Sequence, residues 1–294
     1  MDITQIEFPG VIVDFAHGSV IGRDHLYCGR VLVGRNNQDA VYCARSSNAF
    51  VAVVCDGCSG GEHSEVGATL AARLLAVTIA DYAETMPDAL AVKRASEWVE
   101  AEIRILANRL GDSLSQTVQD HFLFATMILI IRHDGSDAWA KMFSLGDCVW
   151  AVDTPYSLFK SGLMTTGPYP GNAPPYLGYK LVGSSIDPKL LDFAPSFCVK
   201  VRADANVIIG SDGLMDFESA SKELIPGTKK RVGSIWQFFD DRYYTNPQAA
   251  NRLLHRVNTT VTRVGEDGRL CRTSGLLPDD TTFFAARLRK TDAK

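Results

Sequence analysis

The fold is decided by the stretch VAVVCDGCSGGEHSEVGA, which runs from Val51 to Ala68. Its apolar, β-branched start predicts a strand over Phe50–Cys55 that ends at the turn residues Asp56-Gly57. Small and polar residues follow, and Ser64 is a suitable N-cap for a helix. Apolar residues at helical spacing then predict a helix over Ser64–Ala83. We therefore expect Asp56 at the point where a buried strand turns toward a helix.

The same stretch holds a C-x-x-C pair, Cys55 and Cys58. Such a pair can be a redox dithiol or half of a zinc site. A zinc site normally has a second pair of Cys or His ligands at short spacing, and none is obvious in this sequence. A redox pair usually lies at a helix N-terminus, whereas this helix begins several residues later. We expect the chemistry to belong to Asp56 and not to the thiols.

The 294-residue chain has the composition of a globular protein, with 46% hydrophobic and 22% charged residues. No linker divides it, and the length allows one large domain or two small ones. A net charge of -4 argues against a general nucleic-acid or anionic-membrane surface. The sequence has no signal peptide or membrane-spanning run, and its seven cysteines are scattered. We expect a cytoplasmic monomer with reduced thiols that binds neither nucleic acid nor membranes.

The order of apolar segments predicts an α+β fold. Strands are expected at Val11–Phe15, Ala40–Ala44, Phe50–Cys55, Phe122–Ile131, Ala138–Ser144, Val149–Val152, Tyr176–Val182, Phe197–Val201, Val207–Ile209 and Thr282–Leu288. Helices are expected at Ser64–Ala83, Pro87–Leu110, Ser234–Phe239 and Pro247–Arg263. Because strand and helix do not alternate strictly, a layered α+β fold is favoured over a Rossmann-type sheet. The Gly- and Pro-rich residues 156–175 predict a long surface loop.

Several aspartates share one local design, in which the carboxylate lies where an apolar strand begins or ends. Asp56, Asp147 and Asp212 follow predicted strands, while Asp39 and the pair Asp279-Asp280 precede them. Glycine beside such a residue allows a backbone carbonyl to approach a bound ion. Carboxylates that meet in one place stay ionised only beside cations, and hard oxygen ligands select Mg²⁺ or Mn²⁺ over zinc. Each segment alone is more often a simple turn, so their convergence is a hypothesis.

Five short motifs carry these aspartates. In chain order they are Asn37-Gln38-Asp39, Asp56-Gly57-Cys58-Ser59-Gly60, Gly146-Asp147-Cys148, Ser211-Asp212-Gly213 and Asp279-Asp280-Thr281-Thr282. With them the chain resembles, over roughly residues 18–288, the metal-dependent protein phosphatases of the PPM type (type 2C). It is most similar to a divergent bacterial branch with a "QDA" start and a "DGC…HSEVGA" second element. Each motif is weak alone, but five in the right order are specific.

The resemblance implies one PPM-type domain over residues 1–294, with its core at about 10–289. Its fold would be a four-layer α-β-β-α sandwich, in which two antiparallel sheets are flanked by helix pairs and the metals lie at one end. The two predicted helices after the second motif, and the helices after the fourth, agree with that arrangement. The family's variable flap falls on residues 156–175. We expect Tyr169, and Tyr176 directly after this segment, to touch a protein substrate, unless the segment is a plain loop.

The resemblance also implies the roles of the aspartates. The expected metal ligands are Asp56, Gly57 through its carbonyl oxygen, Asp212, Asp279, Asp147 and Asp39. Asp56 would bridge two Mg²⁺ or Mn²⁺ ions, and Asp147 with Asp212 resembles a third, weaker position. A water between two such ions loses a proton near neutral pH and attacks a phosphomonoester without a phosphoenzyme. Asp56, Asp39 and Asp212 would thus be the catalytic residues.

Two departures from the family concern substrate phosphate and proton transfer. The family usually has an Arg five residues before the Asp of the first motif, but position 34 is Gly. Arg35, Arg30 and Arg23 are therefore the candidates for binding phosphate, each being otherwise a solvated surface residue. Some members have His directly after the second-motif Asp-Gly, where this chain has Cys58. We expect His63 to help begin the helix and not to act in catalysis.

The implied activity is that of a protein serine/threonine phosphatase. Its substrate would be a phosphorylated protein, such as a serine/threonine kinase or the target of one. The alternative is a regulatory or binding domain of the same fold with little catalysis. The presence of every core Asp favours the enzyme.

Overall fold

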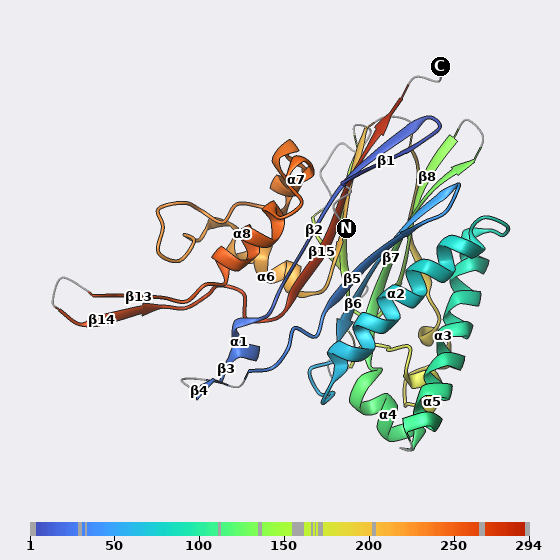
Figure 1. The fold of residues 1–294 in the computed structure, drawn as a ribbon, viewed down its shortest axis with the longest axis horizontal. Coiled ribbons are helices and arrows are strands. Elements are labelled where there is room, and N and C mark those ends of the chain that lie inside the picture. Colours follow the sequence, from blue (N-terminus) through green and yellow to red (C-terminus); the bar gives the residue numbers. More distant parts are fainter. Residues whose placement is uncertain are drawn as a thin grey trace.

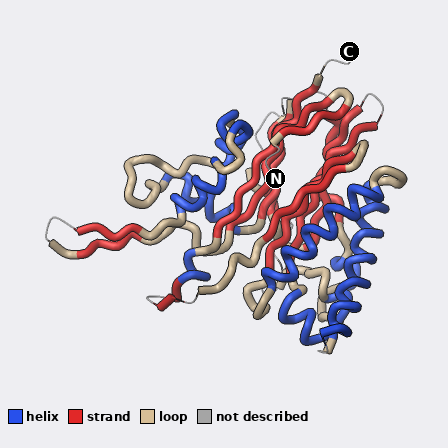
Figure 2. Tube along the Cα trace, viewed as in Figure 1, coloured by secondary structure: helices blue, strands red, loops and turns tan. Residues whose placement is uncertain are grey.

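The computed structural model describes residues 4–28, 31–32, 34–110, 113–134, 137–154, 162–165, 167, 169, 173–201, 204–264 and 268–291. Within these ranges two antiparallel sheets pack face to face, and helices lie on their outer sides (Figures 1 and 2). The expected four-layer α+β sandwich is confirmed. No helix among the described residues has both the length and the apolar character needed to cross a membrane.

The order of the strands places those that carry the motifs next to one another within each sheet. The first sheet has the order β1 (Gln5–Phe8), β2 (Val11–Val20), β15 (Thr281–Lys290), β12 (Ala205–Gly210), β9 (Val149–Asp153) and β10 (Met164–Thr165). The second sheet has the order β11 (Ala194–Val201), β8 (Asp137–Leu145), β7 (Phe124–Asp134), β6 (Ala49–Gly57) and β5 (Ala40–Arg45). Every strand pair in both sheets is antiparallel.

The inner faces of the sheets form an apolar core. Phe15 and Phe284 of the first sheet meet Phe50 of the second, with ring centroids 5.2 to 5.7 Å apart. All three rings are buried, and such aromatic contacts add to the free energy gained by removing the rings from water. The core thus fixes the two sheets against each other.

Two groups of helices cover the outer faces. The second sheet is covered by α2 (Ser64–Tyr82), α3 (Asp88–Leu110), α4 (Leu114–His121) and α5 (Tyr179–Val182). The face that α2 turns toward the sheet is rich in alanine, which allows the helix to lie close to β5 and β6. The first sheet is covered by α6 (Gly213–Ser219), α7 (Asp241–Thr245), α8 (Ala249–Val257) and the 3-10 helices η3 (Ala220–Lys222) and η4 (Ile235–Phe239).

The remaining elements lie at the margins. They are α1 (Arg23–Leu26), β3 (Tyr27–Cys28), β4 (Val31–Leu32), η2 (Pro188–Leu191), β13 (Val261–Val264) and β14 (Leu270–Thr273). The β13–β14 hairpin projects from the body of the molecule on the same side as α1 (Figure 1).

Three local expectations from the sequence need correction, and one helix is additional. The residue capping α2 is His63, and Ser64 is buried, its hydroxyl accepting a hydrogen bond from Gln38 Nε2. Residues 176–182 form a turn and α5, not a strand. The helix expected over Pro247–Arg263 ends at Val257, because the β-branched residues after it favour the strand β13. Helix α4 was not expected, since its sequence, LSQTVQDH, has few apolar residues. Most of the expected flap, residues 156–175, lies outside the described residues.

Candidate metal centre

Strand register brings the motif segments to one end of each sheet. In the second sheet Cys55 pairs with Ala40 and Asp56 pairs with Ala125, so Asp39 and Asp56 lie at the same end. In the first sheet Gly210 pairs with both Val149 and Phe283. The segments that follow β12 and precede β9 and β15 therefore share one end as well. Asp147, Asp212 and Asp279 belong to these three segments.

Hydrogen bonds across the sandwich show that the two ends coincide. The backbone N–H of Asp212 donates to Asp56 Oδ2 at 3.3 Å. The backbone N–H of Gln38, next to Asp39, donates to Asp280 Oδ2 at 2.5 Å. The carboxylate-bearing segments of the two sheets are therefore in contact at this end.

Two motif glycines are required by the close approach of neighbouring segments. A Cβ atom built on Gly57 would lie 2.5 Å from the carbonyl oxygen of Gln38. One built on Gly213 would lie 1.9 Å from the carbonyl oxygen of Asp280. Both contacts are with backbone, which cannot turn aside as a flexible side chain can. Glycine at these positions therefore lets the carboxylate-bearing segments pack together.

The surroundings of the motif aspartates disfavour the ionised form of their carboxyl groups. Burial, followed by the charge of Asp39, raises the pKa of Asp56 well above its usual range. Burial, followed by the charge of Asp280, does the same to the pKa of Asp39. Burial and the charge of Asp279 raise the pKa of Asp212 to about 7. The pKa of Asp147 is raised mainly by burial. Negative charge concentrated in this way is stable when a cation neutralises it.

The donor set fits a hard divalent ion. Asp39 is 8% exposed, and its Oδ2 is buried without a hydrogen-bond partner among the described residues. An orphaned carboxylate oxygen is costly in a protein interior, and an ion would relieve that cost. Carboxylate and carbonyl oxygens are the ligands that Mg²⁺ and Mn²⁺ prefer.

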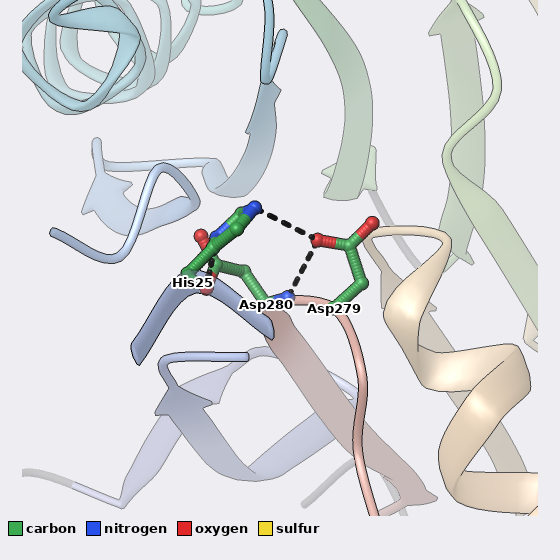
Figure 3. Close-up of side chains that lie close together, drawn as sticks. All are labelled: His25, Asp279 and Asp280. Carbon is green, nitrogen blue, oxygen red and sulfur yellow. Dashed lines mark hydrogen bonds and ion pairs between the residues drawn. The ribbon is translucent and has the colours of Figure 1, made fainter. Parts of the chain in front are cut away.

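A second feature of this end is a contact between His25, Asp279 and Asp280 (Figure 3). His25 Nδ1 lies 2.9 Å from Asp280 Oδ1, and His25 Nε2 lies 3.6 Å from Asp279 Oδ1. In the described part of the chain, no other three His, Cys, Asp or Glu residues bring ligand atoms within 4.8 Å of one another. The Asp280 carboxylate raises the pKa of His25. The sequence analysis singled out Asp280 only as part of the fifth motif, and it gave no role to His25, because neither the spacing nor the composition around His25 marks it.

The candidate phosphate-binding arginines differ in their surroundings. Arg35 Nη1 donates to the carbonyl oxygen of Ser59 at 3.0 Å, which places its side chain beside the second motif. Arg23 Nη1 donates to the carbonyl oxygen of Gly275 at 2.9 Å, and its Nε pairs with Asp24. Arg30 lies outside the described residues. Of the two described candidates, Arg35 is the one that donates a hydrogen bond to a residue of the second motif.

The thiols of the C-x-x-C pair point into different surroundings. Cys55 is buried on the helix side of its sheet, and burial raises its pKa to about 12. Cys58 is half-buried against the core between the sheets. Both are free cysteines, as expected.

The two tyrosines expected to touch a substrate differ in their surroundings. Tyr176 is 9% exposed, so we do not expect it to touch a substrate. The hydroxyl of Tyr169 donates to the carbonyl oxygen of Gly146 at 2.9 Å.

His63 occupies the N-cap position of α2, where its side chain makes no capping hydrogen bond. Its side chain is 54% exposed and its ring is stacked on His121, with centroids 5.5 Å apart. Its ring nitrogens face Glu65 and Glu62, at 3.7 and 4.0 Å, and not the carboxylates of the metal end. The position agrees with a role at the start of the helix.

A family model described as protein phosphatase 2C matches residues 28–253. The chain belongs to the protein phosphatase 2C family. The match covers the first four motifs and most of the sandwich, while Asp279 and Asp280 follow it. No curated protein matches the sequence.

Solved structures of this family share the fold. The phosphatase domain of SpoIIE from Bacillus subtilis, with a fragment of its regulatory domain, is 14% identical, with a TM-score of 0.51 over 97% of this chain and 66% of that one. RsbX, solved with magnesium, is 12% identical, with a TM-score of 0.46 over 97% and 99%. The catalytic domain of the serine/threonine phosphatase PstP, solved with two manganese ions, is 16% identical, with a TM-score of 0.44 over 95% and 99%. At these identities the likeness concerns the fold.

Proposed function

We propose that this chain is a metal-dependent protein serine/threonine phosphatase, which hydrolyses phosphomonoesters. The observation that carries the proposal is the meeting of five motif segments around carboxylates with raised pKa values, one of which, Asp39, has an orphaned buried oxygen. Membership of the protein phosphatase 2C family supports the same activity.

The residues proposed to hold the ions come from both sheets. They are Asp56, the carbonyl oxygen of Gly57, Asp212, Asp279, Asp147 and Asp39. We expect two Mg²⁺ or Mn²⁺ ions, with a third, weaker position near Asp147 and Asp212. When bound, such ions supply a water that is deprotonated near neutral pH and stabilise negative charge on a transferring phosphoryl group.

The chain itself supplies position and charge. Asp56 and Asp212 lie at strand ends fixed by the sheets, so their carboxylates lose little freedom on binding. We expect Arg35, which lies beside the second motif, to bind phosphate oxygens through paired N–H groups. Water adds to phosphorus, the bond from phosphorus to the serine or threonine oxygen breaks, and that oxygen takes a proton from solvent. No side chain forms a phosphoenzyme in this scheme.

The substrate class follows from the family and not from a pocket. We propose a phosphorylated protein, such as a serine/threonine kinase or its target, and we keep monomeric state and cytoplasmic location as predictions. The alternative is a regulatory domain that binds ions or partners with little catalysis. The complete set of core aspartates favours the enzyme.

Hydrolysis of a phosphothreonine peptide with Mn²⁺, with and without EDTA, tests the proposal. We expect release of inorganic phosphate that depends on Mn²⁺ and stops on chelation. Activity that survives EDTA would overturn the metal mechanism. Mn²⁺ binding without turnover would favour the regulatory alternative.

A further inference from the structure

The buried carboxylate of Asp280 joins three chain segments at the metal end. Its Oδ1 accepts a hydrogen bond from the backbone N–H of Gly22 at 2.6 Å. Its Oδ2 accepts one from the backbone N–H of Gln38 at 2.5 Å, and the side chain is 3% exposed. One side chain therefore ties the residue before Asp39, the segment before α1 and the start of β15 together.

His25 completes this junction. Its Nδ1 faces Asp280 Oδ1 and its Nε2 faces Asp279 Oδ1, as Figure 3 shows. Asp279 Oδ1 also accepts a hydrogen bond from the backbone N–H of Asp280 at 2.8 Å. The other oxygen of Asp279 points away from His25 in Figure 3. Both ring nitrogens of His25 thus face carboxylate oxygens of the same segment, although the 2.9 Å contact of Nδ1 does not have the geometry of a hydrogen bond.

The backbone around His25 is held from both sides. The N–H of Arg23 donates to the carbonyl oxygen of Leu277 at 2.8 Å, and the N–H of Asp24 donates to that of Pro278 at 3.0 Å. The carbonyl oxygen of His25 accepts from the N–H of Arg35 at 3.1 Å. The imidazole is thus fixed against the Asp279-Asp280 segment, with 12% of its side chain exposed.

We propose that His25 is a positioning residue for the metal centre. Through Asp280 it holds the segment that carries Asp39, and through Nε2 it orients the half-exposed carboxylate of Asp279. Partners of metal ligands commonly act in this way, and losing one typically costs about 10- to 100-fold in metal affinity. The proposal rests on the proposed function only for the identity of the ions, because its direct effect is on metal binding.

The test compares Mn²⁺ binding by His25→Ala, His25→Gln and the matched control His133→Ala, using calorimetry on the full chain. His133 lies on β7 at the opposite end of the sheet, beyond the Ala49–Arg132 pair. We expect the dissociation constant of Mn²⁺ to rise about 10- to 100-fold in His25→Ala. Gln, which retains a donor, should restore part of the affinity, and His133→Ala should bind as wild type does. An unchanged dissociation constant in His25→Ala would overturn the proposal.

Asp280→Asn gives a second, independent test and guards against a variant that fails to fold. Asn cannot accept at both positions, so Mn²⁺ binding should weaken, whereas Asp14→Asn, at another buried carboxylate far from the site, should leave it unchanged. His25 and Asp280 act through one contact. The double variant His25→Ala/Asp280→Asn should therefore bind Mn²⁺ only slightly less tightly than whichever single variant has the lower affinity. Additive losses would argue against a shared junction.

Activity measurements separate this role from proton donation. At saturating Mn²⁺, His25→Ala should recover most of kcat on both para-nitrophenyl phosphate and phenyl phosphate. A kcat loss confined to phenyl phosphate, whose leaving group is more basic, would assign His25 to proton transfer and overturn positioning. If the wild type binds Mn²⁺ but hydrolyses neither ester, the proposed function fails while the binding comparison still decides the role of His25. A wild type that binds no Mn²⁺ would overturn both.

Discussion

Asp56 and Asp212 meet across the sandwich, the backbone N–H of Asp212 donating to Asp56 Oδ2 at 3.3 Å. Asp56 ends a strand of one sheet, and Asp212 follows a strand of the other. Burial raises the pKa of both carboxyls, and each is raised further by neighbouring aspartates. The metal centre proposed here is therefore also a seam between the sheets, so ion binding and sheet packing should be coupled.

Asp56→Asn should remove phosphatase activity while retaining the fold. We expect kcat on para-nitrophenyl phosphate with Mn²⁺ to fall roughly 100- to 1,000-fold, the scale seen when a preorganised electrostatic group is lost. Because a buried, repelled charge also disappears, the EDTA-treated variant should unfold at a higher temperature than wild type. The control is Asp14→Asn, which removes a buried carboxylate paired with Arg287 and Arg289 and should lower stability without lowering kcat. Wild-type activity in Asp56→Asn would rule out catalysis at this site.

The stability of the metal-free protein should fall as pH rises. Asp212 has a pKa of about 7 in the folded chain against 3.8 for the free side chain. The folded carboxyl thus holds its proton more tightly than the unfolded one. Its contribution to the free energy of unfolding is complete below pH 3.8, is lost as pH rises to about 7, and is constant above that. Thermal unfolding in EDTA at pH 5, 6, 7 and 8 checks the trend.

Two variants test the assignment of that trend. Asp212→Asn should reduce the slope between pH 5 and 7, whereas Asp81→Asn, at an exposed position of α2, should leave it unchanged. Saturating Mn²⁺ should also oppose the trend, because the ion binds the deprotonated carboxylate. A slope that Asp212→Asn leaves intact would assign the effect to other groups.

The sequence predicted the elements better than the contacts between them. Apolar runs ending in Asp-Gly marked β6 and β12 because a buried strand and a glycine turn both leave local signals. Helix α4 left none, since only two of its residues, Thr117 and Val118, are buried. The helical spacing of α8 continued past its true end, where the β-branched residues before β13 favoured extended backbone.

The site was predicted unevenly for a similar reason. The expected aspartates were found through five ordered motifs, and strand register brings their segments to one end. The junction of His25 with Asp280 could not be found in this way, because it joins opposite ends of the chain through side chains. The close packing of Gly22 at this junction is visible only in the folded chain, where a Cβ atom on Gly22 would lie 2.5 Å from the carbonyl carbon of Asp279.

Arg35→Ala should weaken substrate binding more than Arg23→Ala. Arg35 lies beside Ser59 of the second motif, while Arg23 is held by Gly275 and Asp24. We expect KM for a phosphothreonine peptide to rise in Arg35→Ala, and Arg35→Lys to restore it incompletely because a guanidinium binds phosphate through paired N–H groups. Arg23→Ala should chiefly lower the thermal unfolding temperature. A larger KM effect in Arg23→Ala would exchange the two assignments.

Gly213→Ala should destabilise the protein and disturb the metal end together. The added Cβ atom would lie 1.9 Å from the carbonyl oxygen of Asp280 and 2.9 Å from its carbonyl carbon. Alanine is favoured over glycine within a helix, and Gly213 begins α6, so helix propensity alone predicts a gain. The backbone clash should outweigh it and lower the free energy of unfolding by about 1–3 kcal/mol. Urea denaturation in EDTA measures this loss, and calorimetry should show weaker Mn²⁺ binding because Asp280 and Asp279 are displaced. Gly162→Ala, where no described residue lies within 4 Å of the added atom, is the control and should change neither quantity. If Gly213→Ala is as stable as wild type, the close packing of the fourth and fifth motifs is not needed to hold the site.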